Sequence, residues 1–212
     1  MARPRKVGDE QVYEAAFRVM QRRGPSEWTL AEVAAEAGLT AGALVQRYGS
    51  KRALQVELIA QFAEGATQAY EGLLARHASP LAAVRAYAAE LACLAGTPEG
   101  FAHHLDYLRL DLTDPEMHVH FRRQAEAARS FLREALERAV AARELKSRTD
   151  VAALARMLET AVTGSLFTWA TYREGEADAW LKHDLDAVLV PYVRRPRNRE
   201  ARSGGGASSK RA

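Results

Sequence analysis

Apolar residues recur at helical spacing along most of the chain. Between residues 30 and 37, for example, four apolar residues stand three or four positions apart, which places them on one face of a helix. The same spacing returns in one segment after another from Asp9 to about Tyr192. No stretch of useful length alternates apolar and polar residues as a half-buried β-strand does. The pattern predicts an all-α protein with about nine helices.

Capping residues mark several of the helix starts. Asp9 can cap a first helix that Gly24 and Pro25 end, and Ser50 opens a long helix that runs toward His77. Three further starts place a capping residue before a proline at the first helical position. They are Ser79, Thr97 and Asp114.

Residues 29–48 predict two short helices that meet at a glycine turn. Thr29 and Glu32 form a capping box at the first start. Gly38 can adopt the positive φ that stops this helix, and Thr40 can cap the next one. Together these signals indicate a helix-turn-helix, a motif that places its second helix in the major groove of DNA.

The second short helix has one apolar side and one nearly bare side. Leu44 and Tyr48 are four residues apart and are expected in the core. The bare side permits close approach to a partner, and it carries Gly42, Ala43, Gln46 and Arg47.

Residues 9–53 also carry a series of motifs in a specific order. The positions are Arg23-Gly24, Trp28-Thr29-Leu30, Ala34, Ala37-Gly38-Leu39-Thr40, Gly42, Leu44, Tyr48 and Ser50-Lys51. In this order and spacing the segment resembles the DNA-binding region of the TetR family of bacterial transcriptional regulators. The resemblance implies an N-terminal three-helix DNA-binding domain followed by a helical domain that binds a ligand and forms a homodimer.

Two positions depart from the family pattern. Val45 stands where the family usually carries a tyrosine that contacts a phosphate, and Ala43 stands where a threonine or serine is usual. Two polar contacts to DNA are therefore missing. Affinity is expected to depend more on Gln46, Arg47, Lys51 and a short basic arm at the N-terminus, which consists of Arg3, Arg5 and Lys6.

The predicted DNA contacts combine the turn, the second short helix and the basic N-terminus. Gln46 has the geometry to pair with adenine, and Arg47 with guanine or a phosphate, although either would be solvated on an ordinary exposed helix. Helix capping alone would explain Thr29 and Thr40. An ordinary solvated N-terminus would explain the basic residues at positions 3, 5 and 6. The full set is Arg3, Arg5, Lys6, Thr29, Thr40, Ala41, Gly42, Ala43, Val45, Gln46, Arg47 and Lys51.

The last two predicted helices are apolar over more than one face. One runs from Thr149 or Asp150 to about Tyr172, and the other follows Gly175. The family resemblance implies that these two helices pair with those of a second copy as a four-helix bundle. The residues predicted at that interface are Leu158, Val162, Ser165, Leu166, Leu181, Leu185 and Val188.

A small-molecule pocket is predicted between the helices that follow the DNA-binding unit. The resemblance supplies this position but does not identify the effector. Its residues mix apolar bodies with a few polar tips, as ligand sites do, although each would also fit an ordinary core. They are Phe101, His104, Tyr107, Leu108, Met117, Phe121 and Trp169.

Charge is divided unevenly along the chain. Residues 1–53 carry a balance of +3, residues 54–193 a balance of −6, and residues 194–212 a balance of +6. Attraction to phosphate therefore belongs to the ends. We expect a DNA-binding domain at 1–53, a ligand-binding and dimerisation domain at 54–193, and a disordered basic tail at 194–212. The tail would either add non-specific DNA attraction or serve as a solubilising segment.

Little in the sequence points to catalysis. Cys93 is the only cysteine, and phosphate-binding loops, metalloprotease motifs and nucleophile elbows are lacking. Adjacent histidines such as His103 and His104 point to different sides of a helix, which disfavours a shared metal; the same holds for His118 and His120. No apolar run is long enough to span a membrane. We expect a cytoplasmic regulator without enzymatic activity, cofactor or metal.

The sequence therefore predicts a ligand-responsive transcriptional regulator, most often a repressor in this family, that binds a palindromic operator as a homodimer. Two alternatives stay open at this point. One is a non-specific architectural DNA binder that relies on the basic ends. The other is a helical metal-binding protein or enzyme that uses the histidine cluster around His103, His104 and Asp106.

Overall fold

The computed structural model of the chain describes residues 7–194. Within this range the secondary structure is helical apart from one isolated antiparallel bridge between Leu145 and Val193. The described helices are α1 (Asp9–Glu27), α2 (Leu30–Ala37), α3 (Ala41–Tyr48), α4 (Lys51–Arg76), α5 (Pro80–Ala95), α6 (Pro98–Thr113), α7 (Pro115–Ala141), α8 (Val151–Tyr172) and α9 (Ala177–Leu189). The prediction of an all-α fold with about nine helices is confirmed.

Most helices begin where the capping residues predict. Each cap accepts a hydrogen bond from a backbone N–H in the following turn, which satisfies one of the free donors at a helix start. Between the two candidates for α8, Asp150 is the cap and Thr149 precedes it. The residues that act in this way at the starts of α4 to α8 are Ser50, Ser79, Thr97, Asp114 and Asp150.

The first helix differs from its prediction at both ends. Gly8, rather than Asp9, occupies the capping position, and its backbone N–H donates to the side chain of Gln11 at 3.2 Å. The chain breaks helical geometry at Gly24, where φ is +70°, and one more turn begins at Pro25. Because the carboxylate of Asp9 does not cap α1, it is available to another element.

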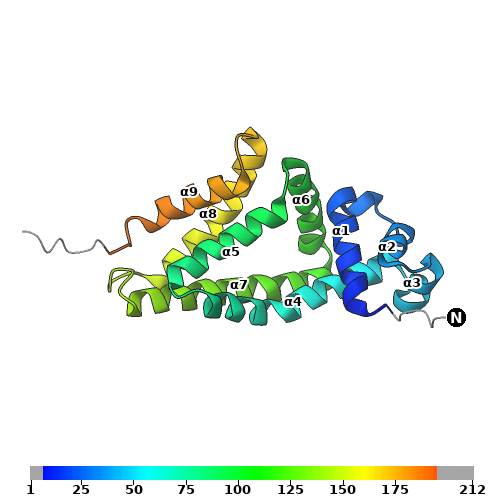
Figure 1. The fold of residues 1–212 in the computed structure, drawn as a ribbon, viewed down its shortest axis with the longest axis horizontal. Coiled ribbons are helices and arrows are strands. Elements are labelled where there is room, and N and C mark those ends of the chain that lie inside the picture. Colours follow the sequence, from blue (N-terminus) through cyan, green and yellow to red (C-terminus); the bar gives the residue numbers. More distant parts are fainter. Residues whose placement is uncertain (1–6, 195–212) are drawn as a thin grey trace, which may run out of the picture.

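Figure 1 shows an elongated molecule with α1, α2 and α3 gathered at one end. Helices α4 and α7 pack along each other, while α5, α8 and α9 form the other side of the molecule. Helix α6 stands between these parts and packs against α1, α7 and α8. The three N-terminal helices are therefore connected to the rest through α4 and α6.

The buried side chains form two separate clusters. The first contains eleven residues of α1 to α4, including Trp28, Leu44, Leu54 and Leu58. The second is larger and draws on α4, α5, α6, α7, α8 and α9. The first two turns of α4 thus pack with the N-terminal helices, beyond the predicted boundary at residue 53. We call α1 to α3 with these two turns the N-terminal domain, and the remainder the second domain.

Across the described residues, the structure contains no helix that is both long and apolar enough to cross a lipid bilayer.

Candidate DNA interface and the seam behind it

The start of α2 is fixed by reciprocal hydrogen bonds. The Thr29 hydroxyl accepts the Glu32 backbone N–H at 3.2 Å, and the Glu32 carboxylate accepts the Thr29 backbone N–H at 2.9 Å. The Thr29 hydroxyl also donates to the Glu32 carboxylate at 3.0 Å, and this bond is the largest influence that holds the pKa of Glu32 below its usual range. At the other end Gly38 has a φ of +70° and closes α2. The predicted capping box and glycine turn are both present.

Helix α3 is anchored by one residue and leaves a broad face open. Leu44 is fully buried, while the Thr40 hydroxyl accepts the Ala43 backbone N–H at 3.2 Å and fixes the start of the helix. The exposed positions on the other side are Ala41, Gly42, Val45 and Gln46. This face of α3 is open to solvent.

Arg47 and Tyr48 turn away from that face toward the start of α1. The Arg47 guanidinium lies 2.6 Å from Asp9 Oδ1 and donates to the Val7 carbonyl at 3.0 Å. The Tyr48 hydroxyl donates to the same Asp9 oxygen at 2.6 Å, and burial followed by this bond raises the pKa of Tyr48. Tyr48 is half-buried against the N-terminal core, and Arg47 is occupied by a partner within the domain.

Lys51 is also held by the domain itself. Its ammonium group lies 4.7 Å from the centre of the Trp28 ring and donates to the Ser26 carbonyl at 3.3 Å. Partial burial lowers the pKa of this lysine. A contact between Lys51 and a phosphate stays a prediction. The predicted basic arm of Arg3, Arg5 and Lys6 lies outside the described residues.

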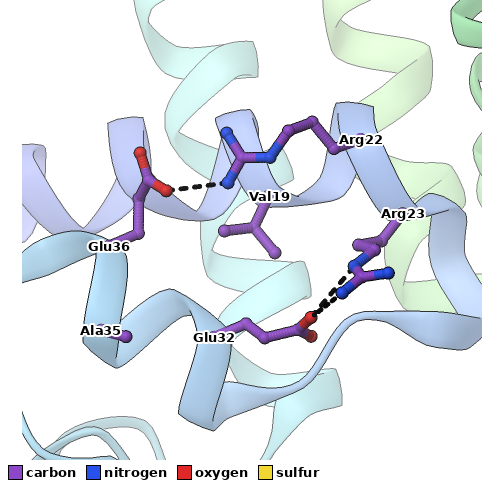
Figure 2. Close-up of a pocket in the computed structure, with 6 residues that line it drawn as sticks. All are labelled: Val19, Arg22, Arg23, Glu32, Ala35 and Glu36. Atoms are coloured by element: carbon purple, nitrogen blue, oxygen red, sulfur yellow. Dashed lines mark hydrogen bonds and ion pairs between the residues drawn. The ribbon is translucent and has the colours of Figure 1, made fainter.

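A hollow of about 590 Å³ lies between α1 and α2, on the N-terminal domain. Figure 2 shows that its charged side chains face one another in pairs, Arg22 with Glu36 at 2.7 Å and Arg23 with Glu32 at 2.9 Å. Because each arginine has a carboxylate partner, the hollow does not present free positive charge to an anion. These pairs, which the sequence analysis did not anticipate, join α1 to α2.

Helix α6 contacts the N-terminal domain along one of its faces, which we call the seam. Tyr107 packs against the N-terminal core, and His103, one turn earlier, lies against Gly24 of α1. A Cβ atom at Gly24 would lie 2.5 Å from His103 Nδ1, so a glycine is needed for the two helices to approach. The positive φ at Gly24 favours glycine independently.

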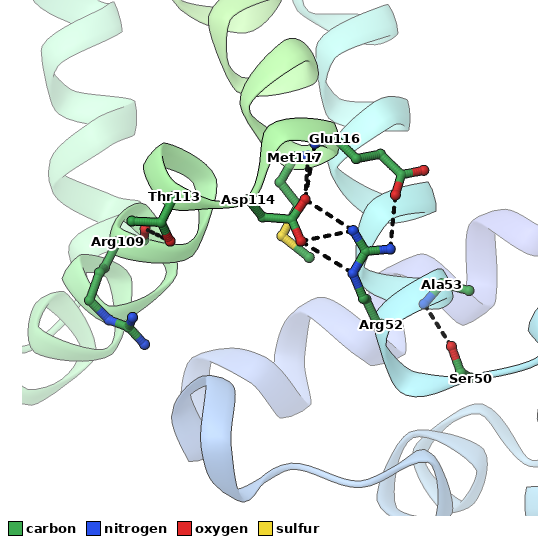
Figure 3. Close-up of polar contacts among 8 residues, drawn as sticks. All are labelled: Ser50, Arg52, Ala53, Arg109, Thr113, Asp114, Glu116 and Met117. Atoms are coloured by element: carbon green, nitrogen blue, oxygen red, sulfur yellow. Dashed lines mark hydrogen bonds and ion pairs between the residues drawn. The ribbon is translucent and has the colours of Figure 1, made fainter.

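An arginine closes the seam where α6 meets α7. Figure 3 shows the Arg52 guanidinium of α4 facing Asp114 and Glu116, with nitrogen–oxygen distances of 2.8 Å to each. Asp114 also caps α7 by accepting the backbone N–H groups of Glu116 and Met117. The bonds from Arg52, the largest influence, hold the pKa of Asp114 below its usual range. The sequence offered one signal for this contact, because Arg52 lies in the first turn of α4. The helix dipole disfavours a cation at that end of a helix unless acidic side chains lie nearby.

Several buried polar atoms find no hydrogen-bond partner among the described residues. They include the Gln55 amide nitrogen and one oxygen of Asp111. Burial raises the pKa of Asp111 to about 6. Burial also raises the pKa of the Tyr107 hydroxyl in the seam, while its interaction with the Trp28 side chain acts in the opposite direction.

Comparisons with known proteins identify this domain. Residues 12–58 match the model of the bacterial regulatory proteins of the tetR family. The N-terminal domain is a TetR-family DNA-binding domain. A search of curated proteins finds no match to the sequence.

Solved structures extend the TetR-type fold over the rest of the chain. A TetR transcription regulator of Haloarcula marismortui aligns at 16% identity with a TM-score of 0.71, covering 88% of this chain and 98% of its own. SmeT, the repressor of the Stenotrophomonas maltophilia multidrug efflux pump SmeDEF, aligns at 23% identity with a TM-score of 0.62, covering 89% and 92%. FadR of Bacillus subtilis, in complex with stearoyl-CoA, aligns at 15% identity with a TM-score of 0.63, covering 86% and 98%. At these identities the likeness establishes the fold.

In this TetR-type fold, most of the residues predicted at the dimer interface lie inside the protomer. Six of the seven are buried in the second core, and only Val188 is partly exposed. The six buried residues are Leu158, Val162, Ser165, Leu166, Leu181 and Leu185. Helices α8 and α9 pack on each other, and they also pack on α7 and α5, respectively. These contacts within the protomer bury the wide apolar faces that the sequence analysis assigned to a partner. A partner must therefore contact other positions of these helices.

The predicted effector pocket is divided between the two sides of α6. Phe101 and Trp169 belong to the second core, whereas Tyr107 packs on the N-terminal core. Met117 is buried, while Leu108 and Phe121 are half-buried. The seven residues do not line a common cavity among those described, because positions 101 and 107 fall on different faces of one helix. Tyr107 is a seam residue.

His104 is one of the two polar residues of the predicted pocket. It lies beside Phe101, with ring centroids 6.0 Å apart. The His104 side chain is exposed to solvent on one side. The surrounding protein nevertheless removes part of the water around the ring, and this desolvation lowers the pKa of the imidazole. Among residues 7–194, no three or more histidine, cysteine or acidic side chains are grouped so as to hold a metal ion.

Proposed function

We propose that the protein is a homodimeric, ligand-responsive transcriptional repressor that binds a palindromic operator in double-stranded DNA. The observation that carries this proposal is the exposed face of α3, held by Thr40 and Leu44 in a TetR-family domain. Two such helices fit successive major grooves when a dimer holds them about one helical turn (~34 Å) apart. The proposal needs no catalytic residue, metal or cofactor.

The dimer contact is proposed on the outer side of α8. Exposed residues Met157 and Phe167 lie on either side of Gly164, at 44% and 56% exposure. A Cβ atom added at Gly164 would meet no atom within 4 Å, so packing within the protomer does not require a glycine there. A helix of a second copy that crosses α8 at Gly164 would bury the side chains of Met157 and Phe167. Its close approach would also explain why the position between them is a glycine.

A small molecule is proposed to act on DNA binding through α4 and α6. Helix α4 begins in the N-terminal core and ends in the second core, and Arg52 near its start is tied to the α6–α7 corner. A ligand beside His104 would bias the position of α6 and, across the seam, that of the N-terminal domain. Such a ligand lowers DNA affinity only by the difference in its own affinity for the two arrangements. FadR of Bacillus subtilis, which has a similar fold, forms a complex with stearoyl-CoA, and this supports a ligand-binding role for the present protein.

The proposal is tested by footprinting the purified full-length protein on the DNA that flanks its own gene. A protected palindrome, with preference over random duplex at the same salt concentration, is expected. Candidate ligands should then release the DNA. If the protein shows no preference for any flanking sequence, the proposed function is wrong.

A deletion separates this function from architectural DNA binding. Removing residues 195–212, which carry much of the basic charge, should leave protection of the palindrome largely intact. Loss of all binding on this deletion would favour the architectural alternative, because non-specific affinity depends on the number of phosphates neutralised.

A further inference from the structure

The exposed face of α3 is unusual for a DNA-reading surface in its lack of charge. Gln46 is its only side chain that can hydrogen-bond to a base, while Ala41, Gly42 and Val45 have no polar side-chain atoms. Val45 is 48% exposed. A single exposed apolar residue is common on protein surfaces. Here, however, it lies beside the bare centre of the helix face that is proposed to meet DNA.

Arg47, the one cation of α3, already has partners within its own domain. The Arg47 guanidinium is paired with Asp9 at 2.6 Å and bonded to the Val7 carbonyl at 3.0 Å. Guanine is most often recognised by a bidentate arginine or lysine. With Arg47 held by the start of α1, recognition of guanine from this face is disfavoured.

Gly42 permits the backbone of α3 to come close to its partner. It lies within the helix without a positive φ, and a Cβ atom placed on it would meet no atom within 4 Å. Glycine inside a helix costs about 1 kcal/mol relative to alanine. The packing of the protein itself does not require a glycine at position 42. The lack of a side chain there would instead allow a partner molecule to approach the backbone of α3 closely. Close approach would bring Val45, three residues further along, to the edges of the bases.

The only apolar group on the major-groove edge of DNA is the C5 methyl of thymine. Branched aliphatic side chains such as valine bind such a group by burying it away from water, whereas the other base edges offer only donors and acceptors. Gln46 beside Val45 can pair bidentately with adenine. The face therefore matches an A·T-rich core rather than a guanine-containing one.

We propose that Val45 is a specificity-determining residue that selects thymine in each operator half-site through contact with its methyl group. This inference rests on the proposed function, because it requires that α3 enters the major groove. It names the base pairs that the proposed operator contains at the centre of the contact, with Gln46 reading an adjacent adenine.

The experiment compares thymine with uracil, which differs only by that methyl group. Full-length protein first selects its site from a pool of random duplexes, and each thymine of the selected half-site is then replaced singly by uracil. At one position the wild type should lose about fourfold in affinity, the factor expected for burial of one methyl-sized group. Val45→Ala should bind the thymine duplex more weakly and lose nothing further on the uracil duplex.

Val119→Ala is a matched control, since Val119 is an equally simple and exposed apolar residue at 58%, on α7 of the second domain. It should keep the fourfold effect of uracil. Folding of Val45→Ala is checked by its melting temperature, which should be unchanged because the side chain lies outside the core.

The outcomes separate the inference from the function on which it rests. If a site is selected but the effect of uracil is the same in the wild type and in Val45→Ala, the inference is overturned and the proposed function stands. If the selected half-sites are rich in G·C at their centre, the inference is also overturned. If no sequence is enriched, both fall.

Discussion

The two domains of this protein use their apolar and polar residues in different ways. The N-terminal domain buries eleven residues in its core, whereas the second domain buries twenty-seven. The smaller domain supplements its core with charge pairs between helices, such as Arg22 with Glu36 and Arg47 with Asp9. The second domain also has charge pairs between helices, such as Arg85 with Asp186 and Arg129 with Glu159, but these lie around a much larger core. A core as small as that of the N-terminal domain leaves little stability to lose.

The same contrast holds for the surfaces proposed to meet partners. On α3 the outward residues are mostly small and uncharged, and Leu44 is the one residue of the helix that is buried in the core. On α8 most apolar residues face the protomer's own core, and the outward surface has a few large residues around Gly164. On the short helix α3, the small side chains themselves mark the candidate partner surface. On the long helix α8, most apolar residues serve the protomer's own core, so the sequence pattern does not distinguish a partner surface. Four predictions test this comparison, beginning with the largest effect.

Leu44→Ala should destabilise the N-terminal domain by about 2–5 kcal/mol, because it opens a cavity in a small core. DNA binding should be lost while the second domain stays folded. Urea unfolding followed by circular dichroism should then separate into two transitions, of which the earlier and smaller one belongs to the N-terminal domain. Leu132→Ala, at a fully buried position of the second domain, is the counterpart and should shift mainly the larger transition. A single shared transition in both variants would show that the domains unfold as one unit.

Gly24→Ala should cost more than Gly38→Ala, although both glycines have a φ of +70°. Gly38 has the left-handed conformation, with a ψ of 30°, which costs about 1–2 kcal/mol for alanine. Gly24 has a ψ of 173°, in a region that is essentially restricted to glycine, so its backbone cost is larger. Only at Gly24 does the new Cβ atom also meet a neighbour, His103, while that of Gly38 would meet none within 4 Å. Adding His103→Ala to Gly24→Ala should recover the part of the difference that comes from this contact; if it recovers none, α1 and α6 are not closely packed at Gly24.

Gly42→Ala and Gly164→Ala should each stabilise the fold by about 0.5–1 kcal/mol, since both glycines lie inside helices with open space around them. Their effects on partners should differ. Gly42→Ala should weaken DNA binding and leave the oligomeric state unchanged, and Gly164→Ala should weaken dimerisation as measured by sedimentation. If either substitution stabilised the protein without any effect on binding, the corresponding surface would not be an interface.

Asp111→Asn should give the smallest effect, which depends on pH. Burial raises the pKa of Asp111 from 3.8 to about 6, so the folded state holds more protons than the unfolded state between these values. Stability contributed by this residue is therefore present at low pH and falls as the pH rises from about 4 to about 6. Asp111→Asn should raise the melting temperature at pH 7 and not below pH 4.

The sequence by itself determined the helices and the helix-turn-helix. Caps such as Thr29, Thr40 and Asp114 act on backbone groups two or three residues away, so their effect can be read without knowing the tertiary structure. The glycine at position 38 is local in the same sense. Asp9 is the exception, because Gly8 caps α1 and the carboxylate of Asp9 binds Arg47 and Tyr48 of α3.

Only the tertiary structure decided which side chains are available to partners. Helical periodicity places Leu158 and Leu181 on apolar faces, but the same pattern serves a core and a dimer interface equally well. Packing of α8 on α9 turned these residues inward, and the turn of α6 carried Tyr107 to the seam. Likewise, the freedom of Arg47 depends on Asp9, thirty-eight residues earlier in the chain. Such assignments depend on which helices meet, and contacts between distant segments are set by the packing of the whole molecule.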